Sequence, residues 1–129
     1  MQNVAARIVT RSRKYDHITP VLVSLHWLPV EFRIQFKLLC LVFQCLNGTA
    51  PLYLSSLLNL YKPSRSLRSQ DMNLLMVPKV KSVQYGNRSF AYAASVAWNK
   101  LPQNLRDCCD YQTFRTLLKT HMFQLAFKV

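Results

Sequence analysis

The sequence predicts a mainly α-helical protein, a small single-domain helical bundle with at most one short β-hairpin near residues 74–85. Apolar residues recur at helical spacing in three segments, 30–47, 89–100 and 111–125. With 129 residues, the chain has room for one domain and one core. Half of its residues are hydrophobic, which is ordinary for a globular protein.

The N-terminal part predicts two short helices. The first is a basic helix over residues 2–14. Its apolar side contains Val4, Ala5, Ile8 and Val9, and another side contains Arg7, Arg11 and Lys14. The second begins with Thr19 as its N-cap and Pro20 at its first helical position. Pro29 ends this helix, because proline disfavours helical geometry in the residue before it.

Residues 30–47 are expected to form a buried central helix. Their first half alternates polar and apolar residues, as a half-buried strand would, but their second half places apolar residues in blocks. On a helical wheel, one narrow polar stripe within about 40° contains Arg33, Lys37 and Gln44. Asn47-Gly48 then supplies a left-handed C-terminal cap, so helix is favoured over strand.

The middle of the chain is less regular. A short helix is expected to start at Ala50-Pro51 and to reach Leu58. Residues 62–73 are polar and predict an exposed loop. Residues 74–85 contain β-branched residues in period-two stretches, which is typical of a short hairpin. Pro78 would confine that hairpin to an edge or a turn.

After Gly86 the pattern is helical again. One side of the helix over residues 89–100 contains Ala91, Ala94, Ser95 and Trp98. The three small residues among them allow a neighbouring element to approach closely. A short turn or helix follows Pro102, and Asp110 caps the final helix. That helix has on its apolar side Phe114, Leu117, Leu118, His121 and Leu125, opposite Arg115 and Lys119. The predicted core contains Leu39, Phe43, Leu46, Trp98 and Phe114.

The charge balance indicates a polyanionic partner. Seventeen Lys and Arg residues face five acidic residues, for a formal net charge of +12. Basic side chains bind phosphates and exposed aromatic rings stack on unpaired bases, so RNA or single-stranded DNA is the expected ligand. The candidate contacts are Arg7, Arg11, Arg13, Lys14, Arg65, Arg68, Lys79, Lys81 and Arg88. A solvated basic surface is the alternative, and both Trp27 and Trp98 are expected to pack in the core.

Other chemistry lacks the residues that it needs. The two glycines, Gly48 and Gly86, are too few for a phosphate-binding or dinucleotide-binding loop. Carboxylates for a two-metal site are scarce, and Asp107 and Asp110 are expected at caps and on the surface. Structural zinc prefers two closely spaced cysteine pairs, a pattern not met by Cys40, Cys45, Cys108, Cys109, His17, His26 and His121. We expect packed thiols, no metal and no cofactor, although spacing leaves a Cys-His nucleophile pair open.

The sequence also bears on compartment. The first sixteen residues contain no apolar stretch of signal-peptide length, so an intracellular protein of the nucleus or cytoplasm is expected. The apolar run from Leu38 to Leu46 has nine residues and is interrupted by Gln44, whereas a spanning helix needs about 20. Membrane insertion is therefore not expected. We also expect no small-molecule substrate.

A series of motifs across almost the whole chain resembles a known family. In order they are HITPVLVSLHWLPVEFRIQFK, LNGTAPLYLSSLL, YKPSRSLRS, VPK, GNRSFAYAASVAWNKLP and TFRTLLKTHMF. Together they resemble the C-terminal region of the LINE-type, non-LTR, jockey-like retrotransposon polyprotein, downstream of its reverse transcriptase core. Residues 1–16 resemble the lead-in helix to this region, and residues 17–129 the helical C-terminal module.

The resemblance implies an origin in an RNA-directed DNA polymerase but carries over no catalytic residue. The catalytic aspartate pair of that family lies in the polymerase palm, and this chain contains no Asp-Asp. Cys108-Cys109 also lacks the spacing of the cysteine-histidine knuckle that ends some LINE clades. A non-catalytic fragment that binds RNA or DNA non-specifically is therefore expected. The alternative is a structural or protein-interaction tail that packs on the polymerase thumb, with no nucleic-acid binding of its own.

Overall fold

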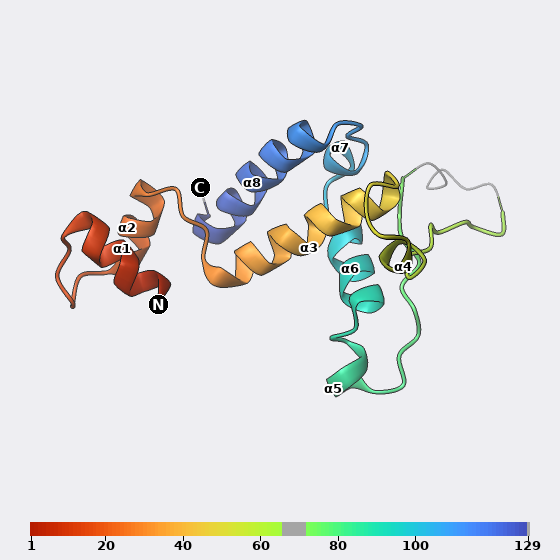
Figure 1. The fold of residues 1–129 in the computed structure, drawn as a ribbon, viewed down its shortest axis with the longest axis horizontal. Coiled ribbons are helices and arrows are strands. Elements are labelled where there is room, and N and C mark those ends of the chain that lie inside the picture. Colours follow the sequence, from red (N-terminus) through yellow and green to blue (C-terminus); the bar gives the residue numbers. More distant parts are fainter. Residues whose placement is uncertain (66–71, 129) are drawn as a thin grey trace.

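The computed structural model describes residues 1–65 and 72–128, and in these residues it is mainly helical (Figure 1). The described helices are α1 Gln2–Thr10, α2 Ile18–Ser24, α3 Val30–Leu46, α4 Leu52–Ser55, α5 Val83–Gly86, α6 Phe90–Asn99, α7 Gln103–Arg106 and α8 Tyr111–Phe127. An isolated antiparallel bridge joins Leu60 to Leu75, and the described residues contain no longer strand. The predicted fold class is confirmed.

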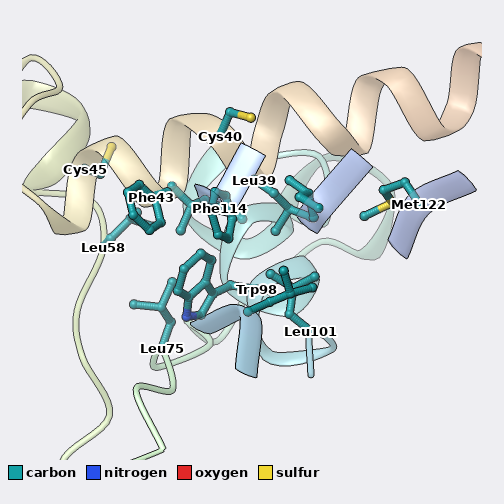
Figure 2. Close-up of a cluster of buried hydrophobic side chains, with 14 of the residues drawn as sticks. Leu39, Cys40, Phe43, Cys45, Leu58, Leu75, Trp98, Leu101, Phe114 and Met122 are labelled. Carbon is teal, nitrogen blue, oxygen red and sulfur yellow. The ribbon is translucent and has the colours of Figure 1, made fainter. Parts of the chain in front are cut away.

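The core forms where three helices meet. Figure 1 shows α3 and α8 running in opposite directions along each other, with α6 crossing below α3. One aromatic ring from each helix meets at the centre, and Figure 2 shows these rings together. Phe114 stacks on Phe43 with ring centroids 4.3 Å apart and lies 5.8 Å from the Trp98 ring. Ala94 and Ser95 are buried beside Trp98, as expected of small residues on a packed helix face.

Most of the predicted core is confirmed. Leu39, Phe43, Trp98 and Phe114 are buried, whereas Leu46 is only partly buried and packs against the edge of the core. Trp27 is likewise only partly buried.

The apolar side of α8 was predicted too broadly. Its buried residues are Phe114, Leu118 and Met122, which are spaced four residues apart. Leu117 and Leu125 are 42% and 53% exposed. A seventeen-residue helix that contacts its neighbours along one line buries only the residues on that line. The apolar residues on either side of that line belong to the same sequence pattern, although they stay exposed.

Pro29 and Gly48 define the two ends of the central helix. Pro29 is the N-cap of α3, where its missing N–H costs no helical hydrogen bond. At the other end Gly48 has φ +70°, and the N–H of Thr49 donates to the Gln44 carbonyl at 2.9 Å. These are the features of a left-handed glycine cap, as predicted.

The shorter helices differ from the predictions in their bounds. α1 ends at Thr10 and not at residue 14, because Arg11 is left-handed with φ 53°. The N-cap of α2 is His17 and not Thr19, so Pro20 lies at the third helical position, still within the first turn. α2 then ends at Ser24, before the expected stop at Pro29. α4 covers only Leu52–Ser55 of the helix expected up to residue 58.

The hairpin considered for residues 74–85 does not form. Asn99 instead holds this segment against α6: the Leu75 N–H donates to its side-chain oxygen, and its side-chain amide donates to the Leu75 carbonyl, both at 2.8 Å. The indole N–H of Trp98 donates to the Asn73 carbonyl at 2.8 Å. The segment therefore covers the core tryptophan, and Ser82 begins α5 as its N-cap.

Asp110 caps α8, as predicted. Its carboxylate accepts hydrogen bonds from the Thr113 N–H at 2.8 Å and from the Thr113 hydroxyl at 2.9 Å. These bonds, the one from the backbone N–H above all, hold the pKa of Asp110 below its ordinary value of 3.8, because they stabilise the charged form.

Acidification is therefore expected to weaken this cap. Its charge-dependent contribution is present above the pKa of an unfolded aspartate and is lost as pH falls through the lower folded pKa. Asp110→Asn keeps a good N-cap without the charge. Between about pH 5 and about pH 2, the thermal unfolding midpoint of the Asp110→Asn variant should fall less than that of the wild type. Equal falls for both proteins would contradict the prediction.

No helix in the described ranges has the length and apolar content that crossing a bilayer requires.

Candidate nucleic-acid interface

The first predicted basic cluster lies on a small helical hairpin. α1 and α2 pack against each other, with Ala6 and Leu22 buried between them (Figure 1). The Gln2 side chain donates to the Leu28 carbonyl at 2.7 Å and ties the start of α1 to the segment after α2. The connection between the two helices carries Arg11, Arg13 and Lys14, whose side chains are all exposed. We call these three residues the turn cluster.

Hydrogen bonds to Asp16 hold this turn. Its carboxylate accepts from the Arg13 N–H at 2.7 Å, and its carbonyl accepts from Arg7 Nη2 at 2.9 Å. Arg7 is half-buried and has a structural role here that the three exposed residues do not share. Tyr15 is 92% exposed, and Lys14 Nζ lies 6.0 Å from the centre of its ring. The turn thus presents cations next to an exposed aromatic ring.

The second predicted group lies elsewhere on the molecule. Its described members are all exposed: Arg65, Lys79, Lys81 and Arg88. Arg68 falls outside the described residues. Figure 1 shows α1 and α2 at one end of the molecule, whereas α5 lies below α6, away from that end. The structure therefore does not bring the two predicted groups together into one patch.

A third basic surface was missing from the sequence prediction. A groove of about 390 Å³ is lined by side chains of α3 and α8, namely Phe36, Lys37, Cys40, Leu41, Gln44, Tyr111 and Arg115. We call it the α3–α8 groove. One turn further along each helix, Arg33 and Lys119 are also exposed. The polar stripe of α3 and the four-residue spacing of Arg115 and Lys119 were the sequence signals for it.

Burial determines the protonation of the groove's neutral groups. It raises the pKa of the Cys40 thiol, while a hydrogen bond with Tyr111 and the charge of Arg115 act in the opposite direction. Burial also raises the pKa of the Tyr111 hydroxyl. Both groups are therefore neutral at physiological pH, and the charge of the groove lining comes from Lys37 and Arg115.

A second cavity, of about 350 Å³, lies among α3, α6 and α8. Its walls are mainly apolar, and its polar side chains are Gln35, Asn87, Tyr92, Lys100 and His121. All four cysteines are free thiols, and burial raises the pKa of Cys45 as it does that of Cys40. Within the described ranges, no three His, Cys, Asp or Glu side chains gather closely enough to hold a metal ion.

Several of the acidic residues are engaged by neighbouring polar groups. Asp16 and Asp110 accept backbone N–H bonds, and Asp107 accepts from the Asn73 side chain at 3.0 Å. What the described surface offers is exposed cations, with an aromatic ring beside them at Tyr15 and at Tyr111. Comparison with protein-family models, with curated proteins and with solved structures gives no match.

Proposed function

We propose that the chain is a non-catalytic helical module that binds RNA or single-stranded DNA without sequence preference. The observation that carries this proposal is the turn cluster, three exposed cations beside the exposed ring of Tyr15, in a chain of net charge +12. Cations that contact phosphates supply sequence-independent affinity, and an exposed ring stacks on any unpaired base.

We further propose that the module derives from the C-terminal region of a LINE-type retrotransposon polymerase. The ordered motifs of the sequence support this origin. The remainder of such a polymerase would then be its natural neighbour, and the nucleus or cytoplasm its place of action. Its part in copying would be to hold template or product strand, because no catalytic residue of that family is carried over.

Neutralising the turn cluster is expected to flatten the salt dependence of binding. The triple variant Arg11→Gln, Arg13→Gln and Lys14→Gln removes three charges and leaves the structural Arg7 in place. If each residue contacts one phosphate, the slope of log affinity against log salt falls by about 2, at about 0.7 per single-strand contact. Fluorescence anisotropy with labelled single-stranded RNA at several salt concentrations measures it. Sequence preference should not change, because phosphate contacts do not read bases.

The turn cluster has a matched control in a part of the molecule away from α1 and α2. Lys79→Gln, Lys81→Gln and Arg88→Gln also remove three charges, from the second predicted group. A smaller change in slope for this control would identify the turn cluster as the main contact. Equal slopes for wild type and turn-cluster variant would remove the turn from the interface. Absence of binding by the wild type at low salt would end the proposal.

A second candidate function is protein interaction, and it rests on α1. Val4, Ile8 and Val9 are 60%, 72% and 62% exposed, although they form the apolar side of that helix. Exposed apolar patches often mark protein–protein contacts. In this alternative the chain packs on a polymerase thumb and does not bind nucleic acid. Concentration-dependent association in sedimentation, abolished by Ile8→Gln, together with no RNA binding, would favour it.

A further inference from the structure

The α3–α8 groove is an open hollow of the surface between two helices, with a cation from each of them in its lining. The two helices are held together by the ring of Phe43, which lies 4.3 Å from that of Phe114 and 6.0 Å from that of Tyr111. The groove lies beside this contact, and its volume of about 390 Å³ falls within the range of ligand pockets. One cation from each helix, Lys37 and Arg115, contributes to its lining.

The cations continue along both helices. Arg33 and Lys37 are four residues apart on α3, as are Arg115 and Lys119 on α8, and all four side chains are exposed. Four residues of helix rise about 6 Å, so each helix presents a cation at about that interval along the groove. Such a repeat is suited to several phosphates of one chain.

Acidic residues do not offset this charge within the groove. None of its seven lining residues is acidic. Glu31 of α3 lies about 160° round the helix from Arg33. Asp110 precedes the lining residue Tyr111 but is not part of the lining, and its carboxylate bonds to Thr113 in the first turn of α8. Phe36 and Leu41 add apolar surface beside the lining cations, where the bases or sugars of a strand can pack.

We propose that the sugar-phosphate backbone of a single nucleic-acid strand lies in the α3–α8 groove. Lys37 and Arg115 contact one phosphate from opposite sides, and Arg33 and Lys119 contact the phosphates that follow. This inference rests on the proposed function and gives it a second contact, away from the turn cluster. It also assigns a role to the polar stripe of α3 formed by Arg33, Lys37 and Gln44.

The test compares two double variants of equal charge. Lys37→Gln with Arg115→Gln neutralises the groove lining, and Lys62→Gln with Lys128→Gln neutralises two exposed lysines outside it. Labelled oligouridylate is titrated against each variant and the wild type at several salt concentrations. We expect the groove variant to lower the salt slope by about 0.7, the value for the one phosphate that both residues contact, and the control to leave it unchanged.

The outcomes separate this inference from the proposed function. Equal salt slopes for the two double variants, with binding retained by the wild type, would overturn the proposal that the groove binds a strand. The proposed contact at the turn cluster would still stand. No binding by the wild type overturns both. A third variant, Leu41→Lys, adds a cation to the partly exposed lining and should raise the slope by about 0.7, which guards against misfolding of the groove variant.

The ligand's phosphate could also come from a small anion. Inorganic phosphate and uridine monophosphate, added at constant ionic strength, are expected not to displace oligouridylate, because neither spans cations on successive helical turns. Displacement of oligouridylate by millimolar phosphate would overturn the proposal that a nucleic-acid strand lies in the groove, and would indicate a small-anion site. Circular dichroism of each variant confirms that the helices have formed.

Discussion

Phe114→Ala is expected to destabilise the protein by about 3–5 kcal/mol, the usual cost of truncating a buried phenylalanine. Phe114 is 0% exposed, and its ring contacts both Phe43 of α3 and Trp98 of α6. Its removal therefore leaves a cavity at the point where the three helices meet. The total stability of a domain is about 5–15 kcal/mol, so the variant loses a large part of it.

Leu117→Ala provides the matched control for this prediction. Leu117 lies less than one turn away on the same helix and is 42% exposed, so its truncation should cost under about 1 kcal/mol. Urea unfolding followed by circular dichroism gives the free energy of unfolding of both variants. Similar losses for the two would show that the aromatic contact does not join α3, α6 and α8.

Asn99→Ala is expected to cost about 2–4 kcal/mol through lost hydrogen bonds. The Asn99 side chain satisfies both backbone groups of Leu75, whose side chain is buried. Each of the two backbone groups left without its partner in this part-buried site costs about 1–2 kcal/mol, the lower part of the range for unsatisfied groups. The segment should also loosen over Trp98, whose indole N–H donates to the Asn73 carbonyl.

Two local measurements test the Asn99→Ala prediction. Hydrogen exchange at the Leu75 amide should become faster, and Trp98 fluorescence should shift to longer wavelength. Asn99→Asp keeps an acceptor for the Leu75 N–H and loses the donor, so its effect should be intermediate. Asn59→Ala, at an exposed side chain, is the control. Unchanged exchange at Leu75 in Asn99→Ala would contradict the role of this side chain.

The long helices were predictable because their signals are local. The polar stripe and the Asn47-Gly48 end predicted the central helix, and Asp110 predicted the start of the last one. Propensity, periodicity and caps act within a few residues of one another. Short helices were less predictable, since their bounds depend on one or two backbone angles. The left-handed turn at Arg11 is an example that the residue type did not indicate.

The segment after the loop shows how tertiary contacts override a local pattern. Residues 74–85 have the alternation of a hairpin, but the backbone N–H and carbonyl of Leu75 bond to the Asn99 side chain, 24 residues further along the chain. Backbone groups that must be satisfied take the partner that packing provides. No spacing rule links these two residues, so the sequence pattern could not predict the pairing.

The basic surfaces divide in the same way. By itself the sequence determined that the protein is helical, where its long helices lie, and that it carries many uncompensated cations. Only the tertiary structure decided which cations share a surface. It separated the two predicted groups, engaged Arg7 in a turn, and placed Lys37 beside Arg115. Those two lie 78 positions apart and meet because α3 and α8 pack in opposite directions around Phe114. Their proximity depends on how buried side chains fit together, which no local pattern encodes.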